Sequence, residues 1–122
     1  MRAEIKAFWS PDIENLEAHR PEDPVNFGYF LQLLIGPADS RGEESFGLMV
    51  CTPRWLESEH SQHDIVVGRH NLFVFEYDFK RLLNYLKDLV SKVEGNTWTV
   101  LAEKLARIGD WEFEDYNASS GP

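Results

Sequence analysis

An apolar stripe at helical spacing fills residues 79–93. Its members recur every three or four residues, as the buried face of an amphipathic helix requires: Phe79, Leu82, Leu83, Leu86, Leu89, Val90 and Val93. Asp78 precedes the stripe as an N-cap, and Gly95 follows it as a stop signal. Thr97 can cap a second helix that ends at Gly109, with an apolar face made of Trp98, Leu101, Leu105 and Ile108. These patterns predict that the C-terminal part of the chain is helical.

The part of the chain before this stripe carries strand patterns. Residues 3–9 alternate, which places Ala3, Ile5 and Ala7 on one face and Glu4, Lys6 and Phe8 on the other. Residues 27–35 form an apolar run and residues 45–52 alternate again, so we expect a hairpin around the polar turn 38–44. Further strand signals lie at 65–67, 70–77 and 111–113, and Pro53 can begin a short helix over 53–59.

Because strands precede helices, the sequence predicts an α+β fold: an antiparallel β-sheet of about four to five strands with two C-terminal helices packed on one face. A length of 122 residues indicates a single domain, 1–122, in which 117–122 is a frayed tail. The chain lacks both a signal-peptide run and the ~20 apolar residues of a membrane helix. A single cysteine, Cys51, agrees with a reducing compartment, so we expect a cytoplasmic protein.

The charge of the chain limits the partners that it can bind. Acidic residues number 21 and basic residues 12, which gives a net charge of −9. Phosphate would be repelled by such a chain, so nucleic acid is excluded as a partner, and the lack of an apolar span excludes a membrane. A basic protein surface would be attracted, and its association would be accelerated roughly 10- to 1,000-fold at low salt. The sequence therefore favours a binding protein with a basic protein partner.

Catalytic chemistry has few candidates in this chain. His60, His63 and Asp64 are close enough in sequence to share a zinc ion, which keeps a small metal-dependent hydrolase as the alternative function. Cys51 and His70 can be considered as nucleophile and base, but Cys51 lies in an apolar strand where a thiol usually acts as a core residue. We therefore predict no enzyme activity, no catalytic residue, no bound metal and no cofactor.

The acidic end of the chain is the strongest functional signal. From Asp110 onward four acids appear without a base, and Glu112 and Glu114 share a face if 111–113 is a strand, with Trp111 opposite them. The predicted contacts to a partner are Glu43, Glu44, Glu57, Asp64, Asp110, Glu112 and Glu114, with Trp111 as the aromatic anchor. A solubilising acidic tail is the alternative interpretation. The cationic triplet 68–70 can contact an anionic group or pair with a carboxylate of its own fold, and we favour the internal pair.

Several strings, in order, resemble one family of bacterial immunity proteins, immunity protein eight. They are Phe8-Trp9-Ser10-Pro11-Asp12, Pro21-Glu22-Asp23-Pro24 before Phe27-Gly28, Gly42-Glu43-Glu44-Ser45-Phe46, Val50-Cys51-Thr52-Pro53 with Trp55-Leu56, Gly68-Arg69-His70, Phe75-Glu76-Tyr77-Asp78 and Gly109-Asp110-Trp111-Glu112-Phe113.

The resemblance implies a small cytoplasmic antitoxin of polymorphic toxin and contact-dependent inhibition systems. Such a protein binds the C-terminal domain of a cognate toxin, often a basic nuclease, and blocks its active site or substrate groove. The acidic charge of this chain agrees with that expectation. The hydrolase remains the alternative, and a structural subunit of a larger assembly is a third option.

Overall fold

A computed structural model describes residues 1–62 and 65–114 of the chain. Five strands form one sheet: β1 (Ala3–Trp9), β2 (Gly28–Pro37), β3 (Glu44–Cys51), β4 (Asn71–Phe73) and β5 (Asp110–Trp111). The order is β1-β2-β3-β4, and β5 pairs with the same edge of β3 as β4 does, at the other end of that strand. Three helices complete the described fold: α1 (Pro53–Glu59), α2 (Phe79–Ser91) and α3 (Trp98–Leu105).

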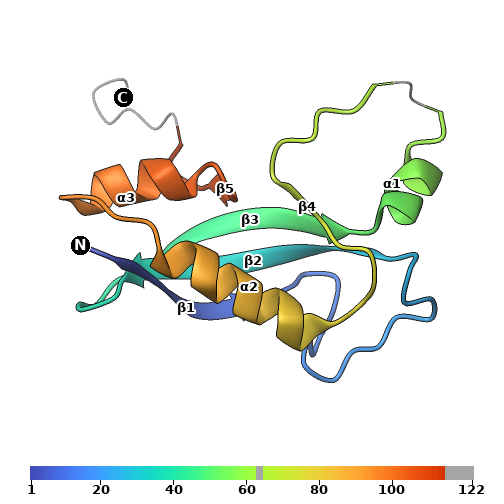
Figure 1. Cartoon of the computed structure of the whole chain (residues 1–122), viewed down its shortest axis with the longest axis horizontal. Coiled ribbons are helices and arrows are strands. Elements are labelled where there is room, and N and C mark those ends of the chain that lie inside the picture. The colour runs from blue at the N-terminus through green and yellow to red at the C-terminus, as the bar shows by residue number, and fades with distance from the viewer. Residues whose placement is uncertain (63–64, 115–122) are drawn as a thin grey trace.

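The core lies between one face of the sheet and the two C-terminal helices, so the predicted α+β fold is confirmed. Figure 1 shows α2 crossing in front of the strands and α3 lying beyond β3, next to β5. Buried side chains of β2 and β3 meet those of the helices, and the set comprises Tyr29, Leu31, Leu33, Ile35, Phe46, Leu48, Val50, Leu82, Leu86, Val90, Leu101 and Leu105. The Tyr29 hydroxyl is buried without a hydrogen-bond partner among the described residues, and this burial raises its pKa.

The three helices begin where the sequence predicts. Thr52, Asp78 and Thr97 are their N-caps, and each side chain accepts a hydrogen bond from the backbone N–H three residues later. α2 ends at Ser91, before the expected stop at Gly95.

The strand at residues 71–73 is shorter than expected and parallel to β3, whereas β1, β2 and β3 pair antiparallel. The chain leaves β3 through α1 and then returns beside it, and such a crossover allows two successive strands to run in the same direction. The strand expected at residues 65–67 does not form. The sheet is therefore mostly antiparallel with one parallel pair.

The expected facing of β1 is wrong at its C-terminal half. The pairing with β2 shifts between Ile5 and Ala7, and this irregularity moves every later residue to the opposite face. Phe8 therefore lies on the core side, where its ring is 5.5 Å from that of Phe79. Trp9 is turned outward and is 51% exposed.

Candidate functional site

Glu44, the first residue of β3, holds two tryptophans. Its Oε1 accepts a hydrogen bond from Trp98 Nε1 of α3, and its Oε2 accepts one from Trp111 Nε1 of β5 at 3.1 Å. The Trp111 ring stacks on that of Phe46 at 6.2 Å, and the Trp98 ring meets Phe46 edge-on at 6.5 Å. The predicted anchor Trp111 is thus half-buried within the fold, and the Glu44 carboxylate links β3, α3 and β5.

Glu112 and Glu114 also bind groups of their own chain. Glu112 Oε1 accepts a hydrogen bond from the backbone N–H of Ser45 at 2.8 Å, and its own N–H donates to the Ser45 carbonyl at 3.1 Å. Glu114 forms an ion pair with Arg69. Residues 112–114 form a turn after β5, so the expected carboxylate row along a strand at 111–113 does not form.

The internal pairing expected for the triplet 68–70 is confirmed. Besides the Arg69–Glu114 ion pair, the His70 ring nitrogen Nε2 lies 2.6 Å from the carbonyl oxygen of Ala106, which follows α3. His70 also has a positive φ of 62°, a conformation that costs an ordinary residue about 1–3 kcal/mol. These contacts tie the start of β4 to the C-terminal elements.

The remaining predicted contacts lie at separate places. Asp110 is exposed opposite Gly47, and Glu43 is exposed just before β3. Glu57 belongs to α1, which follows the far end of β3; eight strand residues span roughly 26 Å. Asp64 lies outside the described residues. The structure therefore brings Glu44, Trp111, Glu112 and Glu114 together at one end of β3 and leaves Glu57 at the other.

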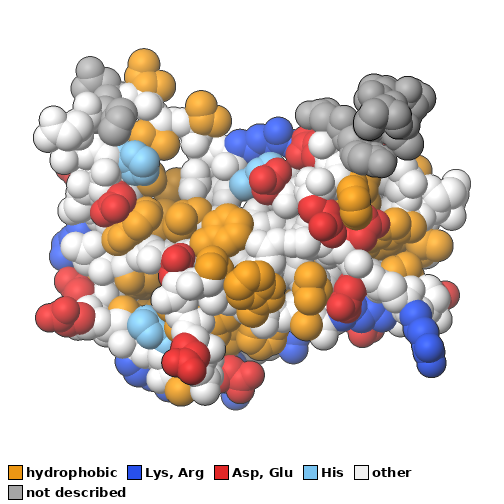
Figure 2. Space-filling model, turned by 180° about the vertical axis from the view of Figure 1, so that it is seen from behind, with side chains coloured by type: hydrophobic (Ala, Val, Ile, Leu, Met, Phe, Trp, Pro, Cys, Tyr) orange, Lys and Arg blue, Asp and Glu red, His pale blue; other side chains and the backbone are white. Residues whose placement is uncertain are grey.

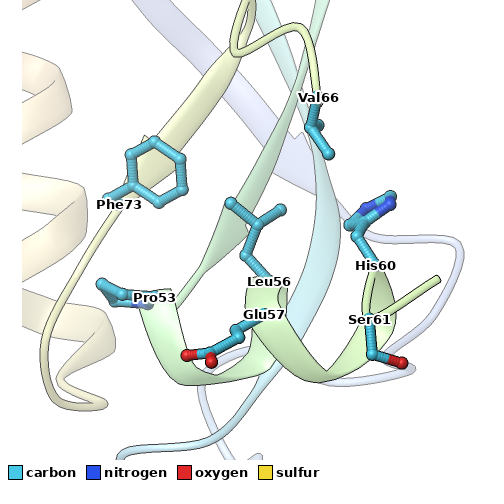
Figure 3. Close-up of a pocket in the computed structure, with 7 residues that line it drawn as sticks. All are labelled: Pro53, Leu56, Glu57, His60, Ser61, Val66 and Phe73. Carbon is cyan, nitrogen blue, oxygen red and sulfur yellow. The ribbon is translucent and has the colours of Figure 1, made fainter. Parts of the chain in front are cut away.

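A hollow of about 550 Å³ lies beside Glu57, between α1 and β4. It is lined by Pro53, Leu56, Glu57, His60, Ser61, Val66 and Phe73. Figure 3 shows Leu56 rising from α1 between Phe73 and Val66, with the Glu57 carboxylate at the rim. An apolar wall with one carboxylate suits the aliphatic stem and charged end of a lysine or arginine side chain.

The residues proposed for other chemistry do not form a reactive centre in the described part of the chain. Cys51 is fully buried, and desolvation raises the pKa of its thiol, which disfavours the nucleophilic thiolate. His60 lines the hollow, whereas His63 and Asp64 lie outside the described residues. Within residues 1–62 and 65–114, no three His, Cys, Asp or Glu side chains gather to hold a metal ion.

A family model described as immunity protein 8 matches residues 3–116. The chain belongs to the immunity protein 8 family. The matched range contains all the strings that carry the resemblance, from Phe8-Trp9-Ser10 to Asp110-Trp111-Glu112. Neither a curated protein nor a solved structure matches this family member. Among its described helices, none has the length and apolar character that crossing a membrane would require.

Two features of this immunity protein 8 chain were not predicted from its sequence. The sharing of Glu44 by two indoles depends on tertiary register, for which the sequence carries no signal. The second feature is the apolar outward face of β2, for which the sequence does carry a signal. Alternate positions in 28–37 place Phe30 and Leu34 on the face opposite the buried residues. Polar side chains would be expected there if water covered this face.

Proposed function

We propose that this chain is an antitoxin that binds and neutralises a cognate toxin domain. The observation that carries the proposal is its membership of the immunity protein 8 family over residues 3–116. A net charge of −9 supports a basic partner. The antitoxin acts in the cytoplasm, by binding rather than by catalysis.

The proposed target is a nuclease domain, and the proposed mechanism is occlusion of its active site. A nuclease needs cationic side chains to hold phosphate, and carboxylates can compete for the same side chains. Exposed Glu43, Glu57 and Asp110 are available for such contacts. The other proposed contacts are the acidic residues Glu44, Asp64, Glu112 and Glu114, which contribute to the same acidic field, and Trp111 as an aromatic anchor.

The proposal predicts that the open reading frame immediately upstream encodes the cognate toxin domain, and that domain provides the first test. Purified toxin domain is assayed on DNA and on RNA with increasing amounts of this chain, and binding is measured by calorimetry. Immunity predicts that cleavage is abolished once the antitoxin is in molar excess. A toxin domain that neither binds the chain nor loses activity would overturn the proposal.

Occlusion requires a separate measurement. A toxin domain inactivated at its catalytic residue is bound to a fluorescent oligonucleotide, and this chain is then added. Release of the oligonucleotide supports occlusion. A stable ternary complex would refute occlusion and the nucleotide-mimicry argument but would leave immunity intact.

A further inference from the structure

One face of the sheet is covered by α2 and α3, and the opposite face is open. None of the described helices lies across the middle of that open face. Figure 2, the view from behind, shows hydrophobic side chains gathered over the middle of it, with charged side chains of both signs around them. A monomer rarely leaves a large apolar surface in contact with water, and such surfaces mark interaction sites.

Aromatic side chains form the centre of this face. Trp9 pairs with Gln32 in the sheet, and Phe30 pairs with Met49, so all four side chains point away from the core. The Phe30 ring lies over Gly47, where an added Cβ would be 2.4 Å from Phe30 Cζ. Trp9 is 51% exposed, and Phe30 and Met49 are half-buried.

The apolar surface continues onto α1. The Trp55 indole covers Gly28, whose outward position would place a Cβ 2.4 Å from the ring. On the other side of α1 lies the hollow, where Phe73 is 44% exposed (Figure 3). We call the side chains of this surface the open-face patch: Trp9, Phe30, Met49, Trp55 and Phe73.

Acidic residues border the open-face patch. Glu57 lies at the rim of the hollow, and Glu22 and Asp23 line a second hollow beside Trp55. Asp110 is exposed opposite Gly47. Within the described part of the chain, no lysine or arginine lines either hollow.

The side of the molecule that carries α2 differs in charge. One of its hollows is lined by Arg20, Lys80 and Lys87 together with Glu17 and Asp78, and the other by Arg81 together with Glu76 and Asp78. Exposed aromatic residues occur there as well, because Phe75 is 79% and Tyr85 56% exposed. Both signs of charge are therefore mixed around the aromatics on the α2 side, whereas the charged residues that line the two hollows of the open-face patch are acidic.

We propose that the open-face patch is the docking surface for the toxin domain, a partner that presents apolar side chains flanked by lysine or arginine. This inference rests on the proposed function. The aromatic residues provide area that loses water on binding, and the bordering carboxylates pair with the cations of the partner. The hollow beside Glu57 receives one of those cationic side chains.

Matched aromatic variants test the surface. Trp9→Ala and Phe73→Ala remove exposed rings from the open-face patch, and Phe75→Ala and Tyr85→Ala remove comparably exposed rings from the α2 side. Affinity for catalytically inactive toxin domain is measured by calorimetry, and folding is checked by thermal unfolding. We expect at least a tenfold loss for the first pair and less than threefold for the second.

The outcomes separate the surface from the function. If the wild type binds the toxin domain and the first pair of variants loses no affinity, the docking surface is overturned but the function is not. The same holds if the second pair loses more affinity than the first. Absence of wild-type binding overturns the function and the surface together. Should the variants unfold, hydroxyl-radical footprinting of the wild-type complex decides: protection of Trp9, Met49 and Phe73 supports the surface, and protection of Phe75 and Tyr85 instead refutes it.

Discussion

A single half-buried carboxylate, that of Glu44, accepts hydrogen bonds from the indoles of Trp98 and Trp111. Acidic residues on a surface are usually solvated, so neighbouring Glu43 and Glu44 look equivalent in the sequence. The structure separates them, because Glu43 is exposed and Glu44 holds two elements to the start of β3. A residue can thus contribute to the net charge and still be committed to the fold.

Glu44→Ala should lower the free energy of unfolding by about 2–4 kcal/mol, since it leaves two indole N–H groups without their acceptor. Glu44→Gln should lower the free energy of unfolding by less than Glu44→Ala does, because its amide keeps one oxygen as an acceptor. Glu43→Ala is the control and should change stability by less than about 0.5 kcal/mol. Urea unfolding followed by tryptophan fluorescence measures all three. Equal losses for Glu43→Ala and Glu44→Ala would contradict this role.

At the scale of elements, the junction between β3 and α1 depends on one buried hydroxyl. Thr52 is 1% exposed, and its Oγ1 accepts hydrogen bonds from the N–H of Phe27 at 3.2 Å and of Trp55 at 3.3 Å. The same atom therefore caps α1 and closes the start of β2. Thr97 caps α3 in the same way but is exposed.

Thr52→Val should destabilise the protein by about 2–4 kcal/mol, because two backbone N–H groups lose their acceptor in a buried place. Thr97→Val removes a cap that water can replace in part, so we expect it to destabilise the protein by about 1 kcal/mol. Chemical denaturation of the two variants gives the comparison. A cost for Thr97→Val as large as that for Thr52→Val would show that burial does not set the difference.

The elements that the sequence predicts well are those defined locally. Caps and apolar spacing locate α2 and α3, and Pro53 locates the start of α1. Alternation locates β1 and β3, and an apolar run locates β2, because all these signals come from neighbouring residues. The facing of Phe8 and the length of β5 were not predictable in this way. The first depends on an irregularity in the pairing with β2, and the second on contacts between Glu112 and Ser45 that join distant parts of the chain.

The candidate site was less predictable than the fold for the same reason. The sequence places acidic residues near the C-terminal end, and the structure brings Trp111, Glu112 and Glu114 close to Glu44 at the start of β3. The sequence cannot indicate that Glu44 binds Trp98 or that Glu114 binds Arg69, since those partners come from other elements. Only the exposed acids, such as Glu57 and Asp110, leave their carboxylates open to a partner within the described structure.

For the whole molecule, a net charge of −9 and a localised apolar surface have different kinetic consequences. Long-range attraction acts before contact, so it governs the association rate, and salt weakens it once the screening length falls below ~10 Å near 0.1 M. Contacts made by the open-face patch exist only in the complex, so they govern the dissociation rate. The two contributions can therefore be separated by experiment.

Raising the salt concentration from roughly 0.02 to 0.5 M should reduce the association rate with the toxin domain by about 10- to 100-fold and change dissociation little. Glu57→Gln, beside the hollow, should slow association more than Glu103→Gln on the exposed surface of α3, although each removes one charge. Trp9→Ala should instead accelerate dissociation. Stopped-flow mixing and surface-based dissociation give the two rates. Because the two glutamate variants carry the same net charge, equal association rates for them would mean that total charge, rather than the acidic border of the open-face patch, attracts the partner.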